Sequence, residues 1–230
     1  MKKTRLCKCH IFFIAMFMLA SSAVNASSTN AILEENIAME GELKEEDYEE
    51  ENRRLMELGE SLSSGTRASA QKVLSIPRLA QNDSAWGNET MRIENKSIAN
   101  AGCYLTSFTM VQRYYGGSLN PSGVNSVMAE SACPFVRTVA ASRFGYTITS
   151  YKESGLTESN IMNYVKGAVT ENVPVIICLN KPAGGQHFVV AKGYVNDVIV
   201  LADPGPQNYT SLAQYFSNGY TIRSVVCFKK

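Results

Sequence analysis

Hydrophobic positions follow a helical period in the middle of the chain. Between residues 103 and 167, apolar side chains mostly recur at intervals of three and four, which predicts helices. One helix is expected over residues 103–115, ending at a glycine pair, and a second after Pro121, which suits an early helical position. A third fits residues 157–170, with Thr157 as its N-cap.

The pattern changes from Pro174 onward to short β-branched runs bounded by turn residues. The predicted strands cover residues 175–179, 188–191, 198–201 and 223–228, with a short helix at 212–216 before the last of them. Asn196-Asp197 is typical of a tight hairpin turn. Helices followed by antiparallel strands predict an α+β fold, with a helical N-terminal half packed on an antiparallel sheet.

The first 26 residues have the layout of a secretory signal. Four basic side chains precede a ten-residue apolar stretch from Ile11 to Ala20, and Val24-Asn25-Ala26 fits the small-x-small cleavage rule. The apolar stretch is too short to span a bilayer comfortably. We therefore expect a secreted or extracytoplasmic chain, associated with the cell envelope at most, without a stable membrane span.

The formal net charge of +1 conceals a strong asymmetry. Residues 34–60 carry twelve acidic and three basic side chains, whereas residues 61–230 carry nine acidic and fifteen basic ones. Without a marked overall basic excess, a nucleic-acid partner is not expected. Leu55, Leu58 and Leu62 have helical spacing, and residues 59–65 are rich in Gly and Ser, as in a linker or a cut site.

Two interpretations of the acidic segment stay open. It could be a solvated spacer, or a propeptide whose negative charge contacts the positive domain and covers its cleft, so that segment 34–60 is an intramolecular partner. The predicted organisation is a signal peptide at 1–26, an acidic propeptide-like or linker segment at 27–67, and a catalytic domain at 68–230.

Candidate chemistry begins with the histidine count. Of two histidines, His10 lies in the predicted signal, which leaves His187 as the imidazole of the mature chain and excludes a His-rich metal site. Cys103 stands at the start of a predicted helix, whose N-terminus favours a thiolate. Asp203 ends the strand that partners the strand of His187, so both lie towards one end of the sheet. Gln81 could donate a hydrogen bond to an oxyanion.

Each of these residues also has a structural interpretation when taken alone. A cysteine at a helix start is commonly a small buried hydrophobe, and Asp203-Pro204-Gly205 fits a simple turn. The other cysteines of the predicted domain are Cys133, Cys178 and Cys227, among which at most one disulfide could form if Cys103 stays free. Because Cys178 and Cys227 lie in apolar strand runs that favour buried thiols, we expect no disulfide. Because the chain has no paired cysteines at metal-ligand spacing, neither a structural zinc nor another cofactor is expected.

Four short motifs, in order along the chain, resemble one known family. They are Leu79-x-Gln81-x-Asp83-x-x-Trp86, Gly102-Cys103-x-Leu105-Thr106-Ser107, His187-Phe188-Val189-Val190 and Val200-x-x-Asp203-Pro204. Over roughly residues 76–228 the chain is similar to papain-fold cysteine peptidases related to bacteriocin-leader (double-glycine) peptidases. The resemblance implies a papain-like fold, with Cys103 as nucleophile, His187 as base, Asp203 as orienting residue and Gln81 as oxyanion donor.

Two departures from that family bear on the substrate. Tyr104 stands where the family often has a small residue, which narrows the predicted site. Leader-processing members are usually fused to a membrane transporter with an ATPase, and this sequence shows neither, so leader processing is not expected. Because the chain is expected to be exported, its substrate should lie outside the cytoplasm. We expect the pocket walls to come from residues 133–151 and 183–185.

These observations predict an exported, monomeric cysteine peptidase that hydrolyses peptide or isopeptide bonds of a peptide or protein substrate. The same residues could instead serve a transpeptidase, a transglutaminase-type enzyme or a cell-wall amide acyl transferase, because they do not fix the acyl acceptor. A non-catalytic peptide-binding module on the same fold is the alternative from another class.

Overall fold

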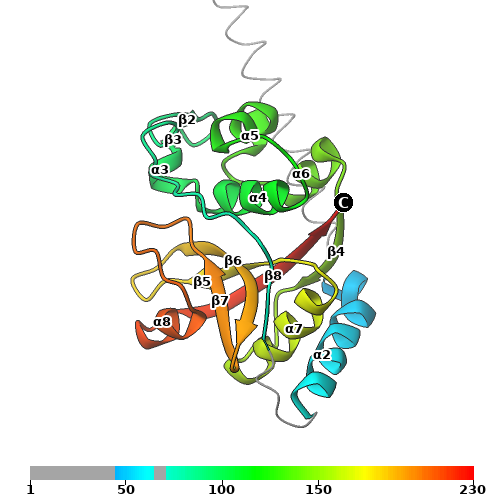
Figure 1. The fold of residues 1–230 in the computed structure, drawn as a ribbon. Helices are drawn as coiled ribbons and strands as arrows, with labels where there is room; N and C mark the ends of the chain where they lie inside the picture. Colours follow the sequence, from blue (N-terminus) through cyan, green and yellow to red (C-terminus); the bar gives the residue numbers. More distant parts are fainter. Residues whose placement is uncertain (1–44, 65–70) are drawn as a thin grey trace, which may run out of the picture.

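The computed structural model describes residues 45–64 and 71–230, so the predicted signal at 1–26 lies outside the described residues. Figure 1 shows a group of helices on one side of a twisted sheet, with further helices along the sheet's other side. Within 45–64 and 71–230, no helix is long and apolar enough to cross a membrane.

The helical group contains both helices predicted first. It consists of α3 (Ile98–Ala101), α4 (Cys103–Tyr114), α5 (Pro121–Met128) and α6 (Arg137–Phe144). Eight consecutive residues of α4 from Leu105 are buried, because the helix packs on the sheet and on its helical neighbours. The side chain of Asn120 caps α5 by accepting a 2.9 Å hydrogen bond from the backbone N–H of Gly123. The predictions for α4 and α5 are therefore confirmed.

The sheet has six strands, and every pairing between them is antiparallel. Its path runs β1-β6-β5-β8-β4, with β7 also paired to β6. The strands are β1 (Gln71–Val73), β4 (Thr147–Lys152), β5 (Val175–Asn180), β6 (Gln186–Val195), β7 (Val198–Ala202) and β8 (Thr221–Lys229). A separate ribbon joins β2 (Thr90–Met91) to β3 (Lys96–Ser97), and α8 (Leu212–Ser217) precedes β8. The α+β class is confirmed.

One strand lies inside the stretch that the sequence pattern assigns mainly to helices. β4 pairs with β8 between α6 and α7 (Glu158–Thr170), so helices and strands alternate there. Its sequence is rich in β-branched and aromatic residues, and Ile148, Ser150 and Tyr151 are buried. The mainly helical pattern expected for this stretch therefore misses the strand at residues 147–152, where the pairing with β8 decides the conformation.

Two local signals act as the sequence predicts. Asn196 and Asp197 both have positive φ, of 47° and 61°, which is the geometry of a two-residue hairpin turn between β6 and β7. Thr157 caps α7 in a capping box with Asn160, whose Oδ1 accepts a 2.7 Å hydrogen bond from the backbone N–H of Thr157.

The described part of the acidic segment forms a short 3-10 helix, η1 (Glu45–Tyr48), and the helix α2 (Glu49–Ser64). α2 packs on α7 and on β4, at the edge of the molecule in Figure 1. Its buried face consists of Asn52, Leu55 and Gly59, whereas Leu58 is half-buried. The predicted helix exists, but the assignment of residues 59–64 to a linker is wrong.

Close backbone contact explains why a glycine belongs in α2. A Cβ at Gly59 would lie 1.9 Å from the carbonyl oxygen of Asn163 in α7, and one at Gly167 would lie 2.0 Å from that of Leu55. The two helices therefore touch through their backbones at both glycines. The same contact continues through polar groups, since Lys166 donates to Ser63 at 2.9 Å.

Candidate active site

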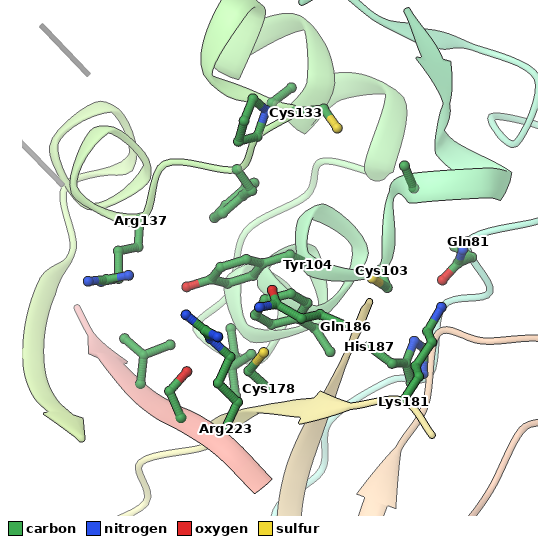
Figure 2. Close-up of a pocket in the computed structure, with 18 of the residues that line it drawn as sticks. Gln81, Cys103, Tyr104, Cys133, Arg137, Cys178, Lys181, Gln186, His187 and Arg223 are labelled. Carbon is green, nitrogen blue, oxygen red and sulfur yellow. The ribbon is translucent and has the colours of Figure 1, made fainter. Parts of the chain in front are cut away.

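A pocket of about 510 Å³ lies between the helical group and the sheet. Figure 2 shows Gln81, Cys103, His187 and Lys181 at one end of it and Arg137 with Arg223 at the other. No residue of 45–64 is among those that line it, so the described part of the acidic segment does not cover this pocket.

Of the two segments predicted to form the pocket walls, the structure confirms residues 133–151 but not residues 183–185. Residues 133–151 supply Cys133, Phe135, Arg137 and Tyr151 to the lining. Residues 183–185 are not among the described residues that line the pocket, although their neighbours Lys181 and Gln186 are. The loop closes on itself, because the backbone N–H groups of residues 181 and 184 bond the carbonyls of residues 185 and 181.

Cys103 is the first residue of α4, directly after Gly102. Backbone N–H groups at a helix start have no intrahelical partner, and their positive end favours an anion. Burial raises the pKa of the Cys103 thiol, but the hydrogen bond and positive charge of His187, together with the backbone N–H of Phe188, bring it below its ordinary value. The thiol is therefore disposed to ionise.

His187 lies between Cys103 and Asp203. Its Nε2 is 2.9 Å from Oδ1 of Asp203, which leaves Nδ1 as the ring nitrogen that can act on the thiol of Cys103. The β6–β7 register, in which Val190 pairs with Ala202, brings Asp203 beside the first residues of β6. Burial lowers the pKa of His187, but the hydrogen bonds and charges of Asp203 and Cys103 raise it to about 9. At neutral pH the arrangement favours an imidazolium beside a thiolate.

The carboxylate of Asp203 is fully buried and held by four donors. Besides His187, the backbone N–H of Gly205 donates to Oδ1 at 2.7 Å. Oδ2 accepts from the backbone N–H of Tyr209 at 2.9 Å and from the hydroxyl of Tyr215 at 2.7 Å. Burial raises the pKa of Asp203, but these bonds and the charge of His187 hold it below its ordinary value. Sequence reasoning missed Tyr215, because a tyrosine in a short helix is commonly a core residue.

Gln81 reaches the same end of the pocket because its segment is bound to the turn after Asp203. The guanidinium of Arg78 donates hydrogen bonds to the backbone carbonyls of Asp203 at 2.8 Å and of Gly205 at 3.0 Å. The backbone N–H of Gln81 donates a 2.8 Å hydrogen bond to the backbone carbonyl of Pro204. Gly205 itself packs on the ring, since a Cβ there would lie 3.0 Å from Cε1 of His187. Arg78 was also missed, since nothing local in the sequence marks it.

The motif around Gln81 forms the turn that presents it. Oδ1 of Asp83 accepts from the backbone N–H of Ala85 at 2.9 Å, and the indole of Trp86 donates to the carbonyl of Ala80 at 2.8 Å. The buried amide of Gln81 donates to the carbonyl of Ala99 at 2.7 Å, and its Oε1 bonds no group within the described ranges. Since an amide nitrogen has two hydrogens, one remains for a ligand at Cys103.

The distance between α4 and β6 is fixed one turn after Cys103. The buried hydroxyl of Ser107 donates to the carbonyl of Phe188 at 3.1 Å. Tyr104 stacks on Phe188, with ring centroids 4.1 Å apart, and packs against Phe135 at 4.4 Å. The large side chain at position 104 therefore forms part of the pocket wall, between two other aromatic rings.

The remaining thiols of the described chain differ from Cys103. Cys133, Cys178 and Cys227 are buried and free, and the first two also line the pocket. Burial raises the pKa of Cys133 to about 11 and those of Cys178 and Cys227 to about 12. Ranges 45–64 and 71–230 hold no group of His, Cys, Asp and Glu that could ligate a metal ion.

Comparison with known proteins agrees with the resemblance seen in the motifs. The sequence model of the Peptidase_C39 like family matches residues 73–226, which is more than half of the chain and includes Gln81, Cys103, His187 and Asp203. A search of curated proteins finds no match. The predicted papain-like fold is confirmed by the family match together with the mixed α+β structure. The chain belongs to the Peptidase_C39 like family and is a cysteine peptidase.

Proposed function

We propose that this protein is an exported cysteine peptidase that hydrolyses peptide or isopeptide bonds, with Cys103 as nucleophile and His187 as its acid and base. Asp203 orients the imidazole, and Gln81 stabilises the oxyanion. The observation that supports this best is the placement of His187, whose Nε2 is 2.9 Å from the buried carboxylate of Asp203 and whose charge lowers the pKa of the Cys103 thiol at one end of the pocket.

The first half of the proposed reaction acylates the enzyme. The Cys103 thiolate attacks the carbonyl carbon, and the negative charge moves to the carbonyl oxygen. There the second amide hydrogen of Gln81 and the backbone N–H of Cys103 stabilise it. The His187 imidazolium gives its proton to the departing amine nitrogen as the carbon–nitrogen bond breaks, which leaves a thioester on Cys103.

The second half restores the thiol. Neutral His187 removes a proton from water, and the resulting hydroxide bonds to the carbonyl carbon of the thioester. The carbon–sulfur bond then breaks, which releases the carboxylic acid and regenerates the Cys103 thiolate. Asp203 keeps the proton-bearing nitrogen of the ring towards itself throughout, so that Nδ1 faces the reacting atoms. An amine in place of water would give the transferase reaction by the same steps.

Export and the role of the acidic segment are part of this proposal. Export rests on the composition of residues 1–26. The described residues 45–64 pack on α7 and β4 and do not line the pocket, which favours a structural role for this part of the segment over inhibition by covering.

The decisive experiment is labelling with a thiol-reactive epoxide at pH 7, using protein that begins at Ser27. One label per chain is expected on Cys103, because its thiol pKa is lowered while those of the other pocket thiols are raised. Cys103→Ala and His187→Ala should lose both the label and cleavage of a diverse peptide library. Cys133→Ala, the matched control from the same pocket, should keep both.

Three results separate the candidate functions. Full cleavage in Cys103→Ala or His187→Ala would overturn the assignment. Labelling with peptide–amine products but no hydrolysis would favour a transferase. Peptide binding with neither labelling nor cleavage would favour a binding module.

A further inference from the structure

The end of the pocket opposite Cys103 carries two guanidinium groups. Arg137 begins α6 and Arg223 lies in β8, and Figure 2 shows both side chains directed to the same end of the pocket. Apart from the His187–Cys103 pair, whose charges cancel, the described lining residues include three cations, the third being Lys181, and one carboxylate, Glu153. The lining therefore has an excess of two positive charges.

The one carboxylate is already engaged by its neighbours. Oε1 of Glu153 lies 3.2 Å from Nη2 of Arg223, and Oε2 accepts a 2.9 Å hydrogen bond from the hydroxyl of Tyr151. The guanidinium of Arg137 lies 4.0 Å above the ring of Tyr151. Both partners of the Arg223–Glu153 pair are about half exposed, at 47% and 49%, so Arg223 remains accessible to a ligand in the pocket.

An aromatic surface joins this cationic end to the catalytic end. Tyr104 follows Cys103 in the chain, and its ring extends from there towards Arg137 in Figure 2. It is supported by the stacked ring of Phe188 and by Phe135. A peptide whose carbonyl carbon lies at Cys103 can therefore pass over Tyr104 to reach the two arginines.

η1 and α2 contact the chain on either side of Glu153, which lines the cationic end of the pocket. Asn52 donates a 2.8 Å hydrogen bond to the carbonyl of Tyr151, and Glu45 accepts from the backbone N–H of Ser154 at 3.1 Å and from its hydroxyl at 2.6 Å. These contacts flank Glu153 on both sides along the chain. The wall is thus fixed before a ligand binds, which reduces the ordering cost of binding.

We propose that Arg137 and Arg223 form a subsite for a carboxylate side chain, so that the preferred substrate is a peptide with Glu or Asp at one fixed position from the cleaved bond. Guanidinium groups bind carboxylates by charge-assisted, often bidentate hydrogen bonds. The excess positive charge of the lining adds an attraction that salt weakens. This inference rests on the proposed function, because it assumes that the carbonyl group of the cleaved bond lies at Cys103.

The test uses peptide pairs that differ only in Glu against Gln or Asp against Asn, taken from sequences that bind Cys103→Ala in a peptide array. Binding to Cys103→Ala is measured for every pair, so that the preference is read without turnover. At least one position should bind about tenfold more tightly with the acid, as expected for a hydrogen bond to a charged group. With active enzyme, the same ratio should be found in KM, with kcat little changed.

Variants assign the preference to the subsite. Arg137→Gln and Arg223→Gln, each added to Cys103→Ala, should bring the ratio close to one while binding of the amide peptide is kept. Arg92→Gln is the matched control, because Arg92 pairs with Glu130 and does not line the pocket. Raising the salt concentration should reduce the preference in the parent protein and leave the two subsite variants unaffected.

Two outcomes would overturn the subsite. They are equal binding of acid and amide peptides at every position, or a preference that persists in both arginine variants. Failure of the proposed function is a different result, in which the active chain neither cleaves peptides nor labels at Cys103, whatever the binding ratio.

Discussion

The hydroxyl of Tyr215 donates a 2.7 Å hydrogen bond to Oδ2 of Asp203, while Oδ1 of the same carboxylate lies 2.9 Å from His187. The carboxylate is thereby held from α8 on one side and presents its other oxygen to the imidazole. The orientation of His187 therefore depends on a residue that follows Asp203 by twelve positions, in addition to the strands that carry the histidine and the aspartate.

Tyr215→Phe should weaken this arrangement without removing a catalytic group. Loss of a hydrogen bond to a buried carboxylate is expected to lower the free energy of unfolding by about 1–3 kcal/mol. The pKa of Asp203 should rise and its hold on the His187 proton should weaken. Chemical denaturation and the pH profile of kcat/KM measure the two effects. Tyr209→Phe is the control, because Tyr209 serves Asp203 through its backbone N–H; equal effects in both variants would contradict the prediction.

The activity should have an alkaline limit set by His187. Its pKa is raised to about 9, so the imidazolium that protonates the leaving amine persists through neutral pH and is lost as pH rises through about 9. The acidic limit should fall below the ordinary pKa of a thiol, because Cys103 ionises more readily than usual. A profile of kcat/KM against pH shows both limits. An enzyme whose activity still rises above pH 10 would not fit.

Asp203→Asn should move the alkaline limit to lower pH. The hydrogen bond of Asp203 is the largest single interaction that raises the pKa of His187, so a neutral replacement returns that pKa towards the ordinary value. The asparagine side chain would also place an NH2 group where Asp203 has an oxygen that accepts from Tyr209 and Tyr215, so hydrogen-bond donors would face each other and those bonds would be lost. We expect kcat/KM to fall by about 10²-fold or more. An unchanged alkaline limit would show that Asp203 does not act on His187.

Gln81→Ala should reduce kcat by about 10²-fold with little change in KM, since an oxyanion donor acts mainly in the transition state. Labelling of Cys103 by the epoxide should continue, because ionisation of the thiol depends on His187. Gln81→Glu, which keeps the size but brings an acceptor, should be at least as slow. Equal kcat in the parent and Gln81→Ala would remove Gln81 from the mechanism.

Gly59→Ala should destabilise the contact between α2 and α7. The added Cβ would lie 1.9 Å from the carbonyl oxygen of Asn163, so the helices must separate. We expect a loss of about 1–3 kcal/mol, as for an overpacked core, measured by chemical denaturation. Glu60→Ala, an exposed substitution at the next position of the same helix, should change the free energy of unfolding by less than about 0.5 kcal/mol. Similar losses in both would show that the close contact is unimportant.

The elements that the sequence predicts well have strong local signals. α4, α7 and the hairpin at Asn196 combine a clear hydrophobic period with a cap or a turn residue, and these decide their conformation. β4 was missed because its identity depends on pairing with β8, about eighty residues later. The β-branched and aromatic residues of the segment favour a strand, but a run of six residues between predicted helices does not show by itself which strand it pairs with.

The candidate site divides in the same way. The short motifs point to Gln81, Cys103, His187 and Asp203. The structure brings the first three to one end of a pocket, and Asp203 bonds the imidazole of His187 there. Arg78 and Tyr215, which hold the turn and carboxylate of Asp203, have no local signal, because their contacts join segments distant in the sequence. Supporting residues such as these become visible only when the chain is folded.

The stretch that matches the family begins at residue 73, yet Asn52 and Leu55 of α2 are buried with the rest of the core. A truncated protein that begins at residue 73 would therefore lack α2 and would expose the backbone of α7 around Gly167, which α2 covers in the full chain. The stretch that matches the family model is shorter than the packed unit, so recombination within this chain would have to carry α2 along to yield a well-packed product.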